Sequence, residues 1–199
     1  MVCDHSSKNA SSRTIMLVAL AWFFSLLPRA ASLSFSLQSA KDAGMNINEV
    51  PGMGLGAFAK EPIECFTYLG EYYGESMTLG QVQARFWGKR EKDASDRKFT
   101  ESRKERGETQ TGHYLFEIQD GTFVDAEDTS VSSWCRYMNH ADGGTHECNC
   151  RPFTQTESDG EYHRPQFYTI RDIEVGEELR WDYGKVFWSK GKTGKPLSN

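Results

Sequence analysis

The sequence predicts a mainly β fold with some helix (β+α). Short runs of β-forming residues alternate with glycine-rich turns from residue 47 onward. Strands and helices do not alternate in a sustained way, which argues against a doubly wound parallel sheet. A charge-rich segment at 81–108, poor in glycine, interrupts the strands and is expected to form a short helical insert.

The composition is that of a globular protein. A chain of 199 residues with 38% hydrophobic and 26% charged residues can bury a core in one domain. These values exclude wholesale disorder and a polytopic membrane protein. The formal net charge of -5 gives no sign of the Lys and Arg excess that nucleic-acid binding usually requires, so no direct nucleic-acid partner is expected. The odd number of cysteines, five, argues against a disulfide framework.

The first part of the chain is expected to lie outside the fold. Lys8 and Arg13 precede an apolar run at 15–27, and small residues follow it, as in a signal peptide. The run is shorter than the roughly 20 apolar residues of a membrane-spanning helix. A cleaved targeting segment is favoured, and an uncleaved anchor, a local helix or a misassigned start are the alternatives. Residues 1–45 are therefore assigned to a targeting or anchor segment and a linker.

The strands are expected to follow in order after this leader. Each is a short run of apolar and β-branched or aromatic residues, and glycines such as Gly70, Gly121 and Gly160 mark the turns between them. The predicted strands are 57–59, 67–73, 114–119, 122–124, 166–170 and 178–181. The insert at 81–108 carries charges of both signs, which is typical of a solvated helix or a mobile insert; a substrate-facing surface is the alternative.

Three short stretches carry residues that could act chemically. The alternating glycines of GMGLGAFA, at 52–59, let the backbone approach a ligand, but Pro62 follows too soon for the long helix of a dinucleotide site. RYMNH, at 136–140, offers side-chain and main-chain hydrogen bonds to a polar ligand. GEELRWDYG, at 176–184, has the pattern of a strand that ends in an aromatic residue and a glycine.

A metal site is not expected, although five possible ligands are close in the sequence. The residues are Cys135, His140, His146, Cys148 and Cys150. Zinc sites usually use a pair of cysteines two to four residues apart, and the single residue between Cys148 and Cys150 is too short a spacing.

Taken together and in order, these stretches resemble the SET-domain protein lysine methyltransferases over about residues 48–188. GMGLGAFA is similar to the glycine-rich opening of that family, and EYYGE at 71–75 to its E-Y-x-G-E. FVDA, RYMNH and DYG then follow in the same order as in the family. Of these, RYMNH is similar to the family's R-F-I-N-H-S. Residues 46–188 are therefore assigned to a SET domain, with 81–108 as its variable insert and 189–199 as a C-terminal tail.

The resemblance implies a fold and a cofactor. The fold would consist of small antiparallel sheets, in which the Asn-His and Asp-Tyr-Gly segments thread through one another as a pseudoknot. The methyl donor would be S-adenosylmethionine, held by glycine-rich backbone, by an asparagine side chain, by histidine main chain and by an aromatic ring on the adenine. The residues expected at the cofactor are Gly54, Leu55, Gly56, Asn139, His140 and Trp188, with Phe187 as the alternative to Trp188.

The resemblance also implies a lysine channel and its catalytic residues. Tyr183 and Tyr72 match the catalytic and channel tyrosines of the family, and Trp181 and Tyr137 are assigned to the channel. A lysine amine, with a reference pKa of about 10.4, must lose its proton to attack, which burial beside a sulfonium cation favours. The family usually has Phe or Tyr where this chain has Trp181, so a narrower channel and monomethylation are expected.

Several positions depart from the family pattern. Ala141 and Asp142 replace the Ser and Cys that usually follow the Asn-His pair, and no cysteine follows Cys150, so the zinc site found after the domain in many members is not expected. Phe66 replaces a glycine that is common before the E-Y-x-G-E strand.

An active monomeric enzyme is the favoured interpretation, because the motif residues are intact. The alternative is a catalytically silent SET module that binds a peptide or acts as a scaffold. The substrate would be a lysine of a histone or of another protein. The leader favours the secretory pathway or an organelle and the family's usual substrate favours the nucleus, so the compartment is left open; a membrane span is expected only if the leader is an uncleaved anchor.

Overall fold

A computed structural model describes residues 34–119, 121–154, 164–184 and 187. All of the described residues belong to one compact unit of the chain, Leu33–Asn199. The expected leader at 15–27, Trp188 and the tail at 189–199 lie outside the described residues. Within the described part of the chain, no helix is long and apolar enough to cross a membrane.

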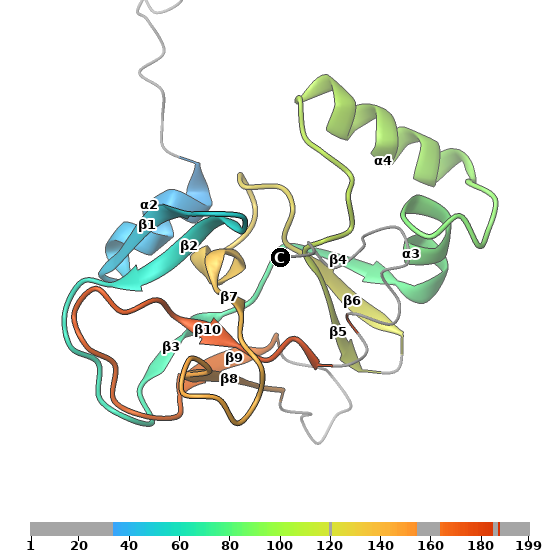
Figure 1. The fold of residues 1–199 in the computed structure, drawn as a ribbon. Coiled ribbons are helices and arrows are strands. Elements are labelled where there is room, and N and C mark those ends of the chain that lie inside the picture. Colours follow the sequence, from blue (N-terminus) through green and yellow to red (C-terminus); the bar gives the residue numbers. More distant parts are fainter. Residues whose placement is uncertain (1–33, 120, 155–163, 185–186, 188–199) are drawn as a thin grey trace, which may run out of the picture. The chain divides into compact units, whose positions relative to one another are not determined.

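The described residues form three small sheets, which confirms the predicted mainly β fold (Figure 1). Strands β1 (Met45–Val50) and β2 (Gly54–Ala59) form an antiparallel hairpin. The second sheet has the strand order β3-β9-β8-β10-β7, and the third has the order β4-β6-β5. Their strands are β3 (Tyr68–Glu71), β4 (Glu75–Thr78), β5 (Leu115–Gln119), β6 (Thr122–Asp125), β7 (Asn139–His140), β8 (Cys150–Phe153), β9 (Gln166–Thr169) and β10 (Arg180–Trp181).

The last strand, β10, lies between β7 and β8 and runs parallel to both. The loop 141–149 joins β7 to β8, and both of its ends are bonded to β10: the Ala141 N–H donates to the Trp181 carbonyl at 3.1 Å and the Asn149 N–H to the Arg180 carbonyl at 3.0 Å. Strand β10 therefore lies between the two ends of the loop 141–149 and is hydrogen-bonded to both, which is the arrangement that a pseudoknot requires. The second sheet is mixed, and not wholly antiparallel as expected, because the two motif segments meet in parallel.

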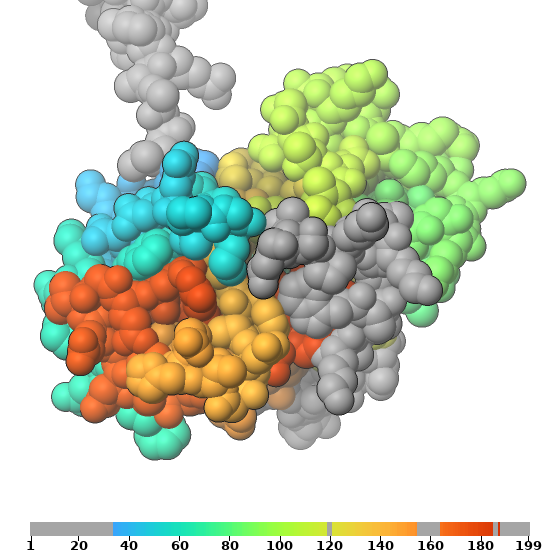
Figure 2. All heavy atoms as spheres, in the orientation of Figure 1, coloured from blue at the N-terminus to red at the C-terminus, as the bar shows by residue number. Residues whose placement is uncertain are grey.

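The insert is helical, as predicted. Helix α3 (Leu79–Arg85) begins at a capping box of Thr78 and Gln81, and helix α4 (Ala94–Glu105) begins at a capping box of Asp93 and Asp96. Figure 2 shows these two helices as a continuous region of the surface on one side of the folded unit. The insert is nevertheless not simply a solvated helix pair, because the side chain of Arg103 on α4 is fully buried.

The fold starts earlier in the chain than residue 46, the predicted boundary. Helix α2 (Phe35–Asp42) buries Ser36 and Ala40, and the Ser39 hydroxyl accepts a hydrogen bond from the Trp134 N–H at 3.0 Å. The Ser- and Ala-rich composition of this segment is that of a leader, but small residues are also what allows a short helix to pack closely on a core. Residues 35–42 are therefore part of the domain and not of a linker.

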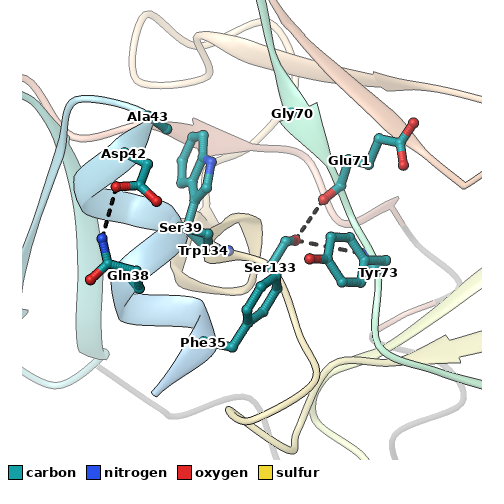
Figure 3. A pocket seen from close by; sticks show the side chains of 10 residues that line it. All are labelled: Phe35, Gln38, Ser39, Asp42, Ala43, Gly70, Glu71, Tyr73, Ser133 and Trp134. Carbon is teal, nitrogen blue, oxygen red and sulfur yellow. Dashed lines mark hydrogen bonds between the residues drawn. The ribbon is translucent and has the colours of Figure 1, made fainter. Parts of the chain in front are cut away.

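Helix α2 also forms one wall of a pocket of about 370 Å³ (Figure 3). Strand β3 and the start of the 3₁₀ helix η1 (Trp134–Tyr137) line the other side. The Ser133 hydroxyl donates to the Glu71 carbonyl at 2.5 Å and holds these two segments together. Neither Tyr72 nor Tyr183 lines this pocket, so it is separate from the predicted catalytic residues.

Phe66, which replaces a common glycine, takes a backbone conformation that glycine favours. Its φ is 62°, and it is the only non-glycine residue with a positive φ among the described residues. The turn before β3 is thus kept without the glycine.

Candidate active site

An aromatic cluster lies where β10 meets β5 and β9. The Trp181 ring stacks on Phe116, with ring centroids 5.4 Å apart, and meets Phe167 edge-on at 5.0 Å. Its third neighbour is Tyr183, at 4.6 Å. The indole Nε1 of Trp181 is buried and has no hydrogen-bond partner among the described residues. A buried donor without a partner is costly, so this N–H is available to a group that enters the site.

Tyr183 is held at both its backbone and its hydroxyl. Its hydroxyl donates to the Met138 carbonyl at 2.8 Å, and its backbone N–H donates to Nδ1 of His140 at 3.2 Å. Burial raises the pKa of the Tyr183 hydroxyl far above its ordinary value, so the group stays protonated at neutral pH. Because the proton is directed at Met138, the oxygen lone pairs can accept a hydrogen bond from another group.

The predicted channel residue Tyr72 follows β3 and lies close to Tyr183. Its side chain is buried, and its ring packs on Phe116 at 5.5 Å and on Phe167 at 6.3 Å. Its hydroxyl donates to the Tyr114 carbonyl at 2.9 Å. Burial first, and then the nearby Tyr183, raise the pKa of Tyr72 well above its usual value. The structure thus brings Tyr72, Trp181 and Tyr183 together.

The glycine-rich strand β2 contacts Asn139, the first residue of β7. The Asn139 amide donates to Oε1 of Glu178 at 2.7 Å and to the Leu55 carbonyl at 3.3 Å. A Cβ on Gly56 would lie 2.5 Å from Oε1 of Glu178 and 3.1 Å from Nδ2 of Asn139, too close for any other residue. Gly54 has a φ of +82°, which L residues rarely adopt.

His140 links the two halves of the site. Because its Nδ1 accepts from the Tyr183 N–H, the ring proton lies on Nε2, which is 3.2 Å from Oδ1 of Asp142. Its backbone pairs with Trp181 in the β7–β10 ladder. One histidine therefore joins the predicted cofactor segment to the predicted catalytic tyrosine.

Tyr137, the other predicted channel residue, packs against helix α2. Its side chain is buried, and its hydroxyl is bonded to the Ser36 hydroxyl of α2 at 2.9 Å. This hydrogen bond anchors α2 to the core. Phe187, the alternative to Trp188, packs its ring on Tyr183 with centroids 4.8 Å apart.

Sequence reasoning missed several groups that shape the site. Phe116 and Phe167 build the aromatic cluster, and the Met138 and Tyr114 carbonyls orient the two tyrosine hydroxyls. The alternating pattern of β5 and β9 could have marked the two phenylalanines as inward-facing. Backbone carbonyls carry no such signal in the sequence.

The cysteines in this region are free thiols. Cys135, Cys148 and Cys150 are buried and unpaired, and burial raises the pKa of Cys135 to about 12. Such thiols are unreactive at neutral pH. The described residues contain no group of three or more His, Cys, Asp and Glu side chains arranged to hold a metal ion.

The sheets and this site together define a protein of the SET-domain class. The SET-domain family model matches residues 54–184, so the chain belongs to that family. The chain is 31% identical to Histone-lysine N-methyltransferase ASHH3 of Arabidopsis thaliana, over 70% of this chain and 32% of that protein. It is 25% identical to N-lysine methyltransferase KMT5A of Xenopus tropicalis, over 74% of this chain and 38% of that protein.

The chain thus spans about a third of the length of these two relatives. The chain is also similar to the crystal structure of the Chaetomium thermophilum polycomb repressive complex 2, at 29% identity over 71% of this chain and 15% of that one, with a TM-score of 0.48. That likeness is too partial to add to the family assignment.

Proposed function

We propose that this protein transfers a methyl group from S-adenosylmethionine to the side-chain amine of a lysine in a protein. The observation that carries the proposal is the state of Tyr183. Its proton is committed to the Met138 carbonyl, so its oxygen can accept an N–H of an incoming amine. The buried aromatic cluster around it disfavours a charged ammonium, and the neutral amine is the form that can attack.

The cofactor side of the proposal rests on Gly54 and Asn139. Among the described residues, no atom beyond the chain neighbours of Gly54 lies within 4 Å of the place that a Cβ on it would occupy, so a ligand can approach the backbone of β2 there. The Asn139 amide lies beside the Leu55 carbonyl. These residues fit a polar cofactor such as S-adenosylmethionine, which supplies an electrophilic methyl group on a sulfonium. The chain's own contribution is to bind the cofactor, to exclude water and to align the amine for an in-line displacement.

The substrate is proposed only as a class. The relatives are named for histone-lysine and protein-lysine methylation, and the same activity on a histone or another protein is proposed here. The formal net charge of -5 favours a protein substrate that is recognised without direct binding to nucleic acid.

Calorimetry with S-adenosylmethionine and the full chain tests this function. Binding is expected, followed by transfer of labelled methyl groups to core histones or to a pool of lysine peptides. A folded sample that does not bind the cofactor would exclude the enzyme. Cofactor binding with no transfer to either acceptor would instead favour the silent, peptide-binding SET module.

Trp181 is expected to restrict the product to monomethyl-lysine. Its indole fills the space between Phe116, Phe167 and Tyr183, and Trp181→Phe would enlarge that space. The variant should therefore release di- and trimethylated products that the parent does not make, seen as peptide masses. Trp134→Phe, which changes a buried indole outside the cluster, is the matched control and should leave the product masses unchanged. Abundant trimethylated peptide from the parent would contradict the prediction.

A further inference from the structure

Three buried carboxylates follow one another at the end of β6. Asp125, Glu127 and Asp128 are 0%, 2% and 1% exposed. Burying a charge is costly unless it is paired or hydrogen-bonded, so each of them needs partners. All three find partners in the insert or in the loop that returns from it: Asp125 with Arg103, Glu127 with the loop 109–112, and Asp128 with Arg106.

Glu127 has the densest set of contacts. Its carboxylate accepts from the Thr109 hydroxyl at 2.6 Å, from the N–H and hydroxyl of Thr111 at 2.8 Å each, and from the Gly112 N–H at 3.2 Å. These hydrogen bonds lower the pKa of Glu127 despite its burial, so the group is ionised. A single side chain therefore fixes the loop that ends two residues before Tyr114.

The carbonyl of Tyr114 is where this loop meets the candidate active site. It accepts from the Tyr72 hydroxyl at 2.9 Å and from the Ala126 N–H at 3.2 Å. Ala126 lies directly before Glu127 in the chain. Glu127 thus restrains Tyr114 from two sides, through the loop 109–112 and through its own backbone.

We propose that Glu127 is a positioning residue for the Tyr72 hydroxyl. It holds the loop 109–112, the loop places the Tyr114 carbonyl, and that carbonyl fixes the direction in which the Tyr72 hydroxyl donates its proton. The inference rests on the proposed methyl transfer, but Glu127 itself touches neither cofactor nor substrate residues. It links the variable insert to the site, because the loop 109–112 is the insert's return segment.

Glu127→Gln is the most direct test, because glutamine keeps the shape of the side chain but has one acceptor oxygen where glutamate has two. The amide N–H₂ of glutamine would face the donors of Thr111 and Gly112, and the loop would lose its anchor. The kcat with a lysine-peptide pool should fall about tenfold or more, since small misplacements near the reacting groups are costly. The KM for S-adenosylmethionine should stay within about twofold, because Asn139 and Gly54 are untouched.

A double-mutant cycle with Tyr72→Phe separates positioning from general stability. If Glu127 acts through the Tyr72 hydroxyl, Glu127→Gln should cost less than about threefold in kcat in the Tyr72→Phe background. Asp128→Asn is the matched control, because Asp128 is a buried carboxylate whose side-chain oxygens accept from Arg106 and Ser130; its effect should be the same in both backgrounds. An equal loss for Glu127→Gln in both backgrounds, or no loss, would overturn the proposal.

A second measurement does not depend on activity. Hydrogen exchange at the amides of Thr111 and Gly112 should speed up in Glu127→Gln and not in Asp128→Asn. Where Glu127→Gln fails to fold, Thr111→Val removes one of the same hydrogen bonds and should give a smaller loss that again vanishes with Tyr72→Phe. A folded parent that binds cofactor but transfers no methyl group would refute the proposed function, while unchanged exchange at the loop would refute the positioning role alone.

Discussion

Tyr183→Phe is expected to lower kcat by about two to three orders of magnitude. The change removes one oxygen from the centre of the site and leaves the ring, whose contacts with Trp181 and Phe187 keep the cluster packed. What is lost is the acceptor that would orient the amine, an interaction that matters only when nitrogen, methyl and sulfur are aligned. Single-turnover transfer from labelled S-adenosylmethionine measures this loss without interference from product release.

The stability cost of Tyr183→Phe should be small beside its kinetic cost. One hydrogen bond, to the Met138 carbonyl, is removed, which contributes about 1 kcal/mol. Tyr168→Phe is the matched control, since the Tyr168 hydroxyl donates to Oε1 of Gln166 on the outer face of the sheet, and it should keep full activity. Normal turnover by Tyr183→Phe, or loss of cofactor binding with no loss of transfer rate in the bound state, would contradict the assigned role.

The parts of the site that could be predicted from the sequence are those that depend on the identity of a side chain. Tyr72, Asn139 and Tyr183 stand in ordered motifs, and Gly56 is required because a Cβ there would strike Glu178 and Val50. The acceptors that aim the tyrosine hydroxyls are backbone carbonyls. Every residue has one, so only the tertiary arrangement decides which carbonyl is used.

The same distinction explains the errors in the fold. The segment 35–42 has the small, polar composition of a linker, and its burial depends on a distant partner, the Tyr137 hydroxyl, that local patterning cannot reveal. Tyr137 is likewise placed by a distant partner, because its hydroxyl is bonded to Ser36 of α2 and not to a residue near it in the chain. Strands β7 and β10 are only two residues long, and β10 forms because β7 and β8, which are distant in the sequence, lie on either side of it.

The charged insert shows how misleading composition can be at a single position. Nine basic and six acidic residues predict a solvated segment, and most of them are indeed at the surface. Asp96 and Arg103 are buried exceptions. The Arg103 guanidinium donates to Asp125 at 2.9 Å and to Glu75, and it lies over the Phe99 ring. One buried ion pair therefore fastens α4 to strands β4 and β6.

Arg103→Met is expected to lower the free energy of unfolding by about 3–5 kcal/mol at neutral pH. Methionine fills much of the space, but it leaves Asp125 as a buried carboxylate without its cation. Arg106→Met is the matched control from the same helix end: Arg106 is 44% exposed, and its partner Asp128 keeps two hydrogen bonds from Ser130. That variant should cost about 1 kcal/mol or less.

The cost of Arg103→Met should depend on pH in a direction that identifies its cause. Burial raises the pKa of Asp125 to about 6, and Arg103 works against that rise. Between the ordinary pKa of 3.8 and this value the folded state binds more protons at Asp125 than the unfolded state, so the stability due to this group increases as the pH falls. Without Arg103 the folded pKa should be higher still, so protonation should relieve the buried charge from a higher pH downward.

Urea unfolding from about pH 8 to about pH 5 should therefore show the largest gap between parent and Arg103→Met at the alkaline end, a gap that narrows as the pH falls toward about 6, and little further change below that pH, where Asp125 is protonated in both folded proteins. Adding Asp125→Asn to Arg103→Met removes the unpaired charge. The double variant should regain part of the lost stability and should lose most of the pH dependence that Arg103→Met introduces. Glu75 is 32% exposed and can remain hydrated, so it should contribute little to either effect. A gap that stays constant with pH would show that lost packing against Phe99, and not the uncompensated carboxylate, is what Arg103→Met costs.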